Sequence, residues 1–213
     1  MLLCPSIMCA DLLKLEEEIK KLDEAGTDIF HMDIMDGCFV PNITLGLNDF
    51  RAVRKLTKKP MDAHLMINDP KDKVDWFIDA GADIVYIHPE SGNDMLETLK
   101  HIRERYVKSG IAINPETTID DIEHLLPYSD YILVMTVHPG FAGQKFIEEV
   151  KDKIKGLVEL KKKYGYQIVI DGGCSPDRIR ELHGMGCDGY VLGTSALFGK
   201  DKPYKELLDD LRK

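Results

Sequence analysis

The segment AGTDIFHMDI at residues 25–34 returns as AGADIVYIHP at residues 80–89 and, more weakly, as MGCDGYVLG at residues 185–193. In each copy the glycine provides a left-handed stop for a helix. The short run of Ile, Val, Phe and Tyr that follows is typical of a buried parallel strand. We therefore interpret each copy as the end of a helix, a turn and a strand.

The spacing of the copies predicts how many units the chain contains. The first two copies lie 55 residues apart and the second and third lie 105 apart, which is about two and four strand-helix units if a unit takes roughly 25 residues. Eight units fit in 213 residues. Amphipathic stretches separate the strands, most clearly LLKLEEEIKKLDEAG, with Leu12, Leu15, Ile19 and Leu22 on one face. The strands are predicted near residues 2–7, 28–34, 60–66, 83–88, 110–114, 130–136, 166–171 and 188–193.

Strict alternation of strands and helices implies a parallel sheet, and eight units close most simply into a single (β/α)8 TIM barrel. An open, doubly wound α/β sheet is the alternative. With 44% hydrophobic residues, the chain is long enough for one core and too short for two enzyme domains, so residues 1–213 are expected to form one domain. The longest loops, 35–46 and 137–147, follow the second and sixth strands, on the barrel face that holds active sites.

Composition narrows the class of partner. A net charge of −9 gives no basic stripe for nucleic acid, so the expected partner is a small molecule. Five cysteines without CxxC spacing fit free thiols in a reducing compartment. The first residues turn acidic and helical too early for a signal peptide, and no apolar run approaches the length of a membrane span. A soluble cytoplasmic protein with no membrane contact is expected.

Polar side chains gather at the ends of three predicted strands. Side chains alternate along a strand, so His31 and Asp33 share one face, as do Asp62 and His64 on the next strand. Asp171 closes the apolar run QIVID, where a buried carboxylate needs something to neutralise it. Together the strand ends offer His31, Asp33, His64 and Asp171, which predicts a site for one divalent transition metal such as Zn, Mn, Fe or Co.

Two alternatives bear on this metal site. Each of the four residues, taken alone, is explained equally well as a polar group at a strand end with local hydrogen bonds. The prediction of a metal site therefore depends on the barrel, which brings the four together. His88, beside Pro89 and Glu90, also ends a strand and is a competing ligand. We favour a place for His88 in the wall of the site.

Small residues follow three adjacent strands near the carboxyl terminus. The loops contain Pro139-Gly140-Phe141-Ala142-Gly143, then Gly172-Gly173, then Gly193-Thr194-Ser195. They would let backbone N–H groups approach a phosphate, helped by a short helix over residues 195–198. Each glycine alone is better explained by a tight turn, but three such loops together predict a phosphate cradle.

Other strand-end residues are candidates for the pocket wall. Met35, Met66 and Met135 lie where core packing more often uses branched aliphatic residues. They are candidates for a dry pocket around an intermediate, with adaptable core filling as the equal alternative. Ser6, at the end of the first strand, is a candidate hydroxyl contact to substrate.

Five stretches in order, PSIMCADLLKLEEE, HMDIMDGCFVPNITLG, MDAHLM, VMTVHPGFAGQKF and DGGCSPD, resemble the ribulose-phosphate 3-epimerase family over essentially the full chain. Within it, CADLLKL, the HPE of 88–90, the NPET of 114–117, MTVHPGFAGQ and GTSALF are more similar to the allulose-6-phosphate 3-epimerase branch. One departure is visible, since Cys38 replaces the histidine of the family's usual DGHFVPN. Because that histidine is no metal ligand, we expect activity to survive, with the effect on substrate fit or loop closure left open.

The resemblance implies a barrel of the ribulose-phosphate-binding type and assigns roles to its residues. Asp33 and Asp171 become the two acid-base residues, and His31, Asp33, His64 and Asp171 the metal ligands. Substrate or phosphate contacts would come from Ser6, His64, Gly140, Phe141, Ala142, Gly143, Gly172, Gly173, Gly193 and Thr194. A ketose phosphate is the expected partner, and a homo-oligomer is expected because such barrels often assemble.

The implied reaction inverts carbon 3 of the ketose phosphate. Two bases on opposite faces would exchange a proton through a cis-enediolate that the metal stabilises. The branch similarity favours D-allulose 6-phosphate to D-fructose 6-phosphate, and the alternative is D-ribulose 5-phosphate to D-xylulose 5-phosphate. A phosphosugar lyase is less favoured, because related lyases use a lysine that HMDIMD lacks. A non-catalytic phosphosugar-binding barrel leaves the buried acids unexplained.

Overall fold

A computed structural model describes all 213 residues. Its eight strands are parallel and form one sheet in the order β1-β8-β7-β6-β5-β4-β3-β2. A parallel bridge between Ser6 and His31 joins β1 to β2, so the barrel is nearly closed. The strands are β1 (Leu2–Pro5), β2 (Phe30–Met35), β3 (Met61–Met66), β4 (Ile84–Ile87), β5 (Lys108–Ile113), β6 (Tyr131–Met135), β7 (Gln167–Asp171) and β8 (Gly189–Leu192).

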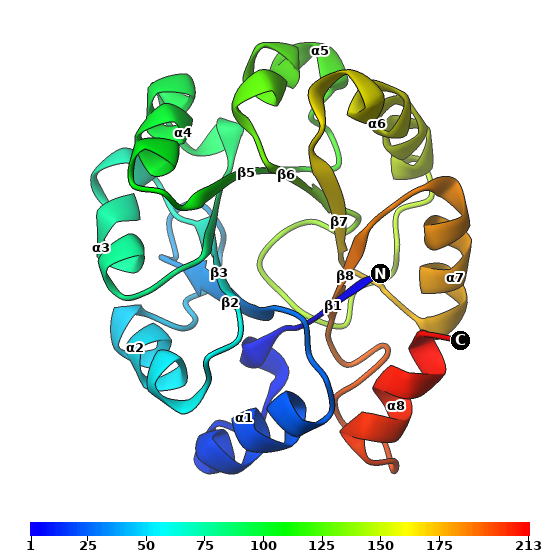
Figure 1. The fold of residues 1–213 in the computed structure, drawn as a ribbon. Coiled ribbons are helices and arrows are strands. Elements are labelled where there is room, and N and C mark those ends of the chain that lie inside the picture. Colours follow the sequence, from blue (N-terminus) through cyan, green and yellow to red (C-terminus); the bar gives the residue numbers. More distant parts are fainter.

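Helices surround the strands on all sides (Figure 1). None is both long and apolar enough to cross a membrane. They are α1 (Leu15–Glu24), α2 (Leu47–Leu56), α3 (Val74–Asp79), α4 (Met95–Glu104), α5 (Ile119–Ile122), α6 (Val150–Tyr164), α7 (Pro176–Met185) and α8 (Tyr204–Leu211). Short 3₁₀ turns add η1 (Ile7–Cys9), η2 (Leu12–Lys14), η3 (Pro70–Asp72), η4 (Pro89–Ser91) and η5 (Glu123–Tyr128).

The predicted TIM barrel is confirmed, and the open doubly wound sheet is excluded by the bridge that closes the barrel. Each predicted strand is present with bounds shifted by at most two residues. Leu12 was wrongly placed on a buried helix face. It is 51% exposed, because residues 12–14 form a 3₁₀ turn and α1 begins only at Leu15.

The short helix predicted over residues 195–198 is absent. Residues 194–199 form hydrogen-bonded turns, since the backbone N–H groups of Leu197 and Phe198 both donate to the carbonyl of Gly193 and no further helical turn follows. The prediction of free thiols is confirmed, because none of the five cysteines forms a disulfide.

Two apolar layers hold the barrel together. The larger one lies between the strands and the helices and contains fully buried residues such as Leu3, Ile19 and Phe50. The smaller one includes Cys4, Ile84, Tyr86, Ala112, Leu133, Val169 and Val191, whose side chains alternate with those of the larger layer along their strands. Because this interior is filled with side chains, polar chemistry is confined to the mouth of the barrel.

The aspartate at the fourth position of each repeated segment, just before the strand, ties neighbouring strands together. Asp28, Asp83 and Asp188 each accept a hydrogen bond from a backbone N–H at the start of β1, β3 and β7, at 2.9, 2.9 and 2.8 Å. Asp130 does the same for β5 at 3.1 Å, although no glycine repeat precedes it. Each carboxylate also pairs with a cationic side chain, and these are Arg212, Arg54, Lys161 and Lys108. The three repeats, two and four units apart, therefore lead into the even-numbered strands β2, β4 and β8.

Replacing Gly110 with alanine should destabilise the barrel interior. A Cβ atom there would lie 2.4 Å from Cδ1 of the buried Tyr86 ring, and overpacking typically costs about 1–3 kcal/mol. The matched control is Gly184→Ala in α7, where no atom lies within 4 Å of the new Cβ. There the higher helix propensity of alanine should raise the free energy of unfolding by up to about 1 kcal/mol. Urea unfolding measures both free energies. Equal stability of the two variants would contradict the tight packing of Tyr86 on Gly110.

Candidate metal and acid-base site

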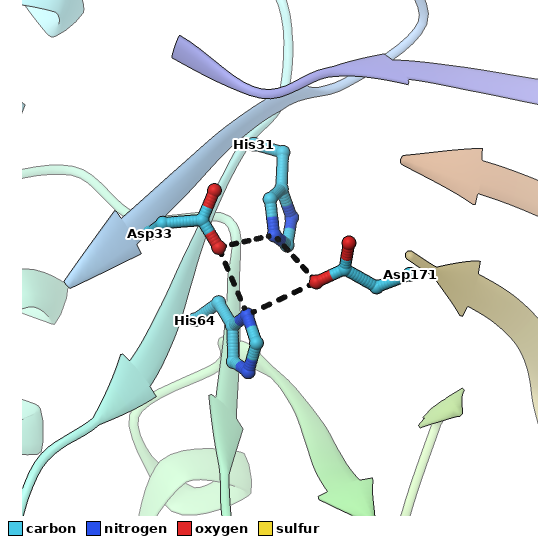
Figure 2. Close-up of side chains that lie close together, drawn as sticks. All are labelled: His31, Asp33, His64 and Asp171. Atoms are coloured by element: carbon cyan, nitrogen blue, oxygen red, sulfur yellow. Dashed lines mark hydrogen bonds and ion pairs between the residues drawn. The ribbon is translucent and has the colours of Figure 1, made fainter. Parts of the chain in front are cut away.

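Four predicted ligands meet at the mouth of the barrel. The carboxylates of Asp33 on β2 and Asp171 on β7 face each other, with the imidazoles of His31 and His64 between them (Figure 2). One ligand atom from each residue lies within 4.8 Å of all the others. The structure therefore brings together two oxygen and two nitrogen donors from three strands.

The separations between donor atoms fit a single ion. Oδ1 of Asp33 lies 3.2 Å from Nε2 of His31 and 3.2 Å from Nδ1 of His64. Oδ2 of Asp171 lies 3.8 and 3.6 Å from the same two nitrogens. Ligands at usual metal-donor distances around a tetrahedral ion stand about 3.4 Å apart. The set fits Zn, Mn, Fe or Co, whose mixed imidazole and carboxylate sites look like this one.

Burial and charge give the two carboxylates different proton affinities. Burial alone would raise the pKa of Asp33, but contacts with His31 and His64 more than offset this and hold the pKa below its usual value. For Asp171, burial raises the pKa, and the negative charge of Asp33 adds to the effect. Pairs of acids whose pKa values are driven apart in this way are typical of acid-base sites.

The two imidazoles also differ. Burial lowers the pKa of His64, so this ring is neutral and has a lone pair for a metal. Burial alone would lower the pKa of His31 as well, but Asp62 and Asp33 raise it above the usual value. Nδ1 of His31 lies 2.8 Å from Oδ1 of Asp62, outside hydrogen-bond geometry, so the attraction between them is electrostatic. The other ring nitrogen, Nε2, faces Asp33 and Asp171.

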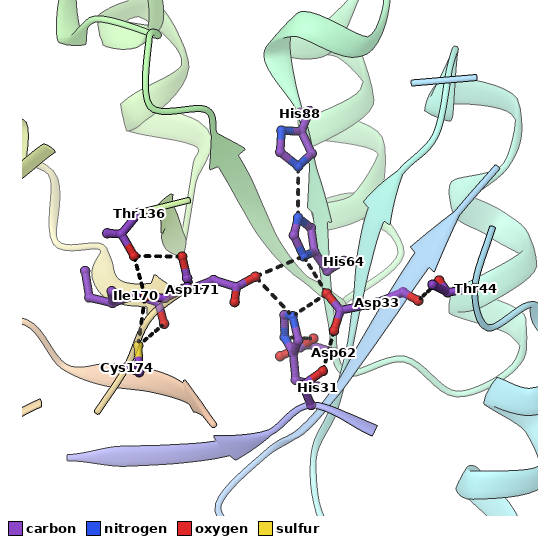
Figure 3. Close-up of polar contacts among 12 residues, drawn as sticks. His31, Asp33, Thr44, Asp62, His64, His88, Thr136, Ile170, Asp171 and Cys174 are labelled. Carbon is purple, nitrogen blue, oxygen red and sulfur yellow. Dashed lines mark hydrogen bonds and ion pairs between the residues drawn. The ribbon is translucent and has the colours of Figure 1, made fainter. Parts of the chain in front are cut away.

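Hydroxyl groups bind the Asp33 carboxylate and the main chain of both acids. Ser6 donates from Oγ to Oδ2 of Asp33 at 2.5 Å. The hydroxyl that was predicted to contact the substrate therefore binds the side chain of a predicted metal ligand. Thr44 donates to the carbonyl of Asp33 at 2.6 Å, and Thr136 donates to the carbonyls of Asp171 and Gly172 at 3.0 and 2.6 Å. Figure 3 shows the two threonines on opposite sides of the site. The main chain at each acid is therefore fixed from outside the ligand set.

A solvent-open pocket lies above the four predicted ligands. Most predicted site residues line it, namely Ser6, Asp33, Met35, Met66, Met135, Gly140, Phe141, Ala142, Gly143, Asp171, Gly172, Gly173, Gly193 and Thr194. His31 and His64 are fully buried beneath its floor. Cys38 is exposed and does not line the pocket, in keeping with a place outside the ligand set.

The glycine-rich loops depend on backbone freedom at two positions. Gly172 has φ +111°, and a Cβ atom there would lie 2.6 Å from Cγ2 of Val137. Gly173 has φ +58°, and its Cβ would lie 3.0 Å from the backbone N of Phe146. Any other residue would be strained at both places, so the backbone after β7 can run beside the loop after β6.

Loops on opposite sides of the mouth also touch. Asn42 in the loop after β2 donates from Nδ2 to the carbonyl of Gly140 in the loop after β6, at 2.6 Å. A Cβ at Gly140 would lie in ordinary contact with Val40 and Pro41. The two longest loops therefore contact each other across the mouth of the barrel.

Sequence reasoning missed several neighbours of the site. Asp62 shares a strand face with His64 and pairs in register with His31, which is the signal that could have assigned its role. His88 is fully buried and does not line the pocket, so the favoured place in the wall is wrong; it lies behind His64, with its Nε2 atom 2.9 Å from Nε2 of His64. The pocket is also lined by Val137, His138, Pro139, Gln144 and Ser195, which belong to the predicted active-face loops but were given no individual role. Nothing in the sequence indicated that Met8, Cys9, Cys174 and Val191 line it as well.

Comparison with known proteins places this architecture in a family. Residues 2–198 match the model of the ribulose-phosphate 3 epimerase family. A ribulose-phosphate 3-epimerase of Synechocystis is 44% identical over 98% of this chain and 91% of its own length. Those of Bacillus subtilis and Escherichia coli are 40% and 37% identical, over 95% and 99% of this chain and 94% of each relative.

Solved structures with low sequence identity share the fold alone. A 3-keto-L-gulonate-6-phosphate decarboxylase from Vibrio cholerae aligns with a TM-score of 0.72 at 14% identity, covering 99% of this chain and 95% of that one. A 3-hexulose-6-phosphate synthase aligns with a TM-score of 0.69 at 19% identity, covering 100% and 98%.

The family match spans nearly the whole barrel, including each strand that carries a residue of the His/Asp cluster. The family is metal-dependent, and this cluster could hold the metal. The chain is an isomerase and belongs to the ribulose-phosphate 3-epimerase family.

Proposed function

We propose that this chain interconverts D-ribulose 5-phosphate and D-xylulose 5-phosphate by proton transfer at carbon 3, with Asp33 and Asp171 as the two bases. The observation that carries the proposal is the placement of these carboxylates, which face each other across two imidazoles at the floor of the pocket (Figure 2). Inversion of a carbon next to a carbonyl needs a base on each face, and this pair provides them.

The choice of a pentulose phosphate rests on the relatives. Those compared above are named ribulose-phosphate 3-epimerase and are 37–44% identical to this chain. The preference for allulose 6-phosphate that the motifs predicted has no support among them. We therefore favour ribulose 5-phosphate and keep the hexulose phosphate, which has one more hydroxymethylene, as the competitor in the test.

Each carboxylate has neighbours suited to its role. Asp33 accepts a hydrogen bond from Ser6 through Oδ2, which leaves Oδ1 directed toward His64 and the opposite acid. Asp171 has a side chain that is 15% exposed, against 5% for Asp33, so it is open to the pocket. We assign Asp33 as base and Asp171 as acid in one direction, with the roles exchanged in the other.

A divalent metal held by His31, Asp33, His64 and Asp171 would supply positive charge next to the carbonyl oxygen as the enediolate forms. Binding to a cation favours the ionised form of both acids and holds their oxygens in one direction. We propose a transition metal, because two imidazoles and two carboxylates suit Zn, Mn, Fe or Co and do not distinguish among them.

The remaining pocket residues are proposed to bind and shield the substrate. Met35 and Met66 pack with Val40 into an apolar cluster at the mouth, and both are at least 95% buried. Together with Met135 they would keep water away from the reacting carbon. The backbone of residues 140–143, 172–173 and 193–194 would bind the phosphate.

Replacing Asp171 with asparagine should abolish turnover and leave phosphosugar binding in place. The amide oxygen can still face the other ligands, but it cannot take up or release a proton, and general acid-base catalysis is typically worth about 10²–10⁴-fold in rate. Steady-state kinetics, calorimetric substrate binding and metal content measured on one preparation separate the two effects. The control is Asp177→Asn, whose carboxylate lies on the surface of α7. Full activity in Asp171→Asn would refute the two-base scheme.

The value of kcat/KM should be higher for ribulose 5-phosphate than for allulose 6-phosphate. A single extra methylene-sized group is usually discriminated by about 10–200-fold in a fitted pocket. Coupled assays that detect xylulose 5-phosphate and fructose 6-phosphate give the two values under the same conditions. A higher kcat/KM for allulose 6-phosphate would reverse the substrate assignment and leave the reaction type unchanged.

A further inference from the structure

A second buried histidine stands behind the ligand His64. Nδ1 of His64 faces Asp33 and Asp171, while its other nitrogen, Nε2, lies 2.9 Å from Nε2 of His88 (Figure 3). The two rings stack, with centroids 5.1 Å apart and planes inclined by 24°. Both rings are fully buried, so no solvent competes for the contact between them.

His88 leads on to Glu90 in the 3₁₀ turn after β4. Oε2 of Glu90 lies 3.4 Å from Nδ1 of His88. This contact is outside hydrogen-bond geometry, so the buried nitrogen has no hydrogen-bond partner and Glu90 is the acidic group that faces it. Oε1 of Glu90 accepts hydrogen bonds from the hydroxyl of Thr117 and from the backbone N–H of Asn114, the latter at 3.1 Å. The carboxylate is therefore anchored to the loop after β5.

The loop after β2 covers this pair. The Phe39 ring lies against His88, with centroids 4.8 Å apart. On the other side, Ser91 donates from both its hydroxyl and its backbone N–H to the carbonyl of His88, at 2.7 and 3.0 Å. The main chain and the ring of His88 are thus both held, and the ring has little freedom to turn away from His64.

Donor and acceptor rules allow only one proton arrangement along this chain once Nδ1 of His64 is a metal ligand. A ligating nitrogen must present its lone pair, so the ring proton of His64 lies on Nε2. Nε2 of His64 then donates to Nε2 of His88, whose own proton must lie on Nδ1. Nδ1 of His88 faces the carboxylate of Glu90, which is an acceptor. Each nitrogen of the chain therefore faces a group of the right kind, and only the step from His88 to Glu90 is not closed by a hydrogen bond.

The other proposed imidazole ligand, His31, has a carboxylate next to it with no second imidazole in between. Nδ1 of His31 lies 2.8 Å from Oδ1 of Asp62, close enough for an ion pair but outside hydrogen-bond geometry. Metal-binding histidines usually donate their second N–H to a carboxylate, a carbonyl or a water. His64 therefore has the same support as His31, except that an imidazole is placed between the ligand and its carboxylate.

We propose that His88 and Glu90 are positioning residues for the metal ligand His64, fixing its tautomer and the direction of its ring. The inference rests on the metal site of the proposed function. The 3.4 Å step from His88 to Glu90 is longer than an ordinary hydrogen bond of about 2.9–3.0 Å. His88 is accordingly the stronger support and Glu90 the weaker one.

Titration of the metal-free chain with Co²⁺ against a chromophoric chelator tests the proposal. His88→Phe should weaken the affinity for Co²⁺ by roughly 10–100-fold, the usual cost of losing such a partner, and should change the visible spectrum of the bound ion. Glu90→Gln should weaken it less. His88→Gln should recover part of the loss, since an amide carries both a donor and an acceptor. The double variant of His88→Phe with Glu90→Gln should bind no more weakly than His88→Phe alone, because both residues act through one chain.

The matched control is His101→Gln, which removes another histidine-carboxylate contact, the one to Asp75 at 3.0 Å on the outer helices. It should leave the affinity and the spectrum unchanged. Unchanged affinity and spectrum in both His88→Gln and Glu90→Gln would overturn the inference, and these two variants decide the matter if His88→Phe does not fold. A wild-type chain that binds no divalent ion would overturn the proposed function together with this inference. Normal binding in the wild type and in all the variants would overturn this inference alone.

Discussion

The backbone hydrogen-bond ladder between β2 and β3 is the constraint on which the site depends. Its register pairs Asp33 with His64 and His31 with Asp62, while the ladder between β6 and β7 ends with Met135 beside Asp171. Because side chains alternate along a strand, a slip of one residue would turn these groups away from the mouth. The aspartates before alternate strands tie neighbouring strands together at the opposite end of the barrel, where no chemistry is placed. Packing and register are thus maintained away from the mouth, which is left free for polar groups.

Electrostatics then decides what the assembled groups can do. Two carboxylates in a buried cluster repel each other, and neither is stable as an anion without a compensating positive charge. In the chain itself the compensation is uneven, since the pKa of Asp33 is lowered by the imidazoles and that of Asp171 is raised by burial. A cation between the four donor atoms would neutralise both acids at once. The same arrangement leaves two proton-accepting oxygens on opposite sides of a pocket, which is the requirement for inverting a carbon atom.

The repeated segments were sufficient to predict the barrel, because a glycine stop followed by a buried strand is a local signal. Asp130 shows that the glycine repeat does not identify every aspartate with this role. It does for β5 what Asp28 does for β1, yet Tyr128 and Ser129 precede it in place of a glycine repeat. The meeting of His31, Asp33, His64 and Asp171 was predictable for a related reason, since strand alternation and strand order suffice to bring these four side chains together. The role of His88 was not, because the direction of a ring and the length of the contact behind His64 depend on packing among four strands.

The sequence motifs were also insufficient to predict the substrate. They favoured the allulose branch, whereas the names of the relatives favour ribulose 5-phosphate. The reaction type is less sensitive to this difference, since both sugars present the same reacting carbons. The most direct test of the central claim is epimerisation of ribulose 5-phosphate in D₂O, with NMR detection of the label at carbon 3 of the first product formed. Two bases on opposite faces predict xylulose 5-phosphate that carries deuterium from the solvent at carbon 3. Product that retains the hydrogen of the substrate at carbon 3 would contradict the exchange of protons between Asp33 and Asp171.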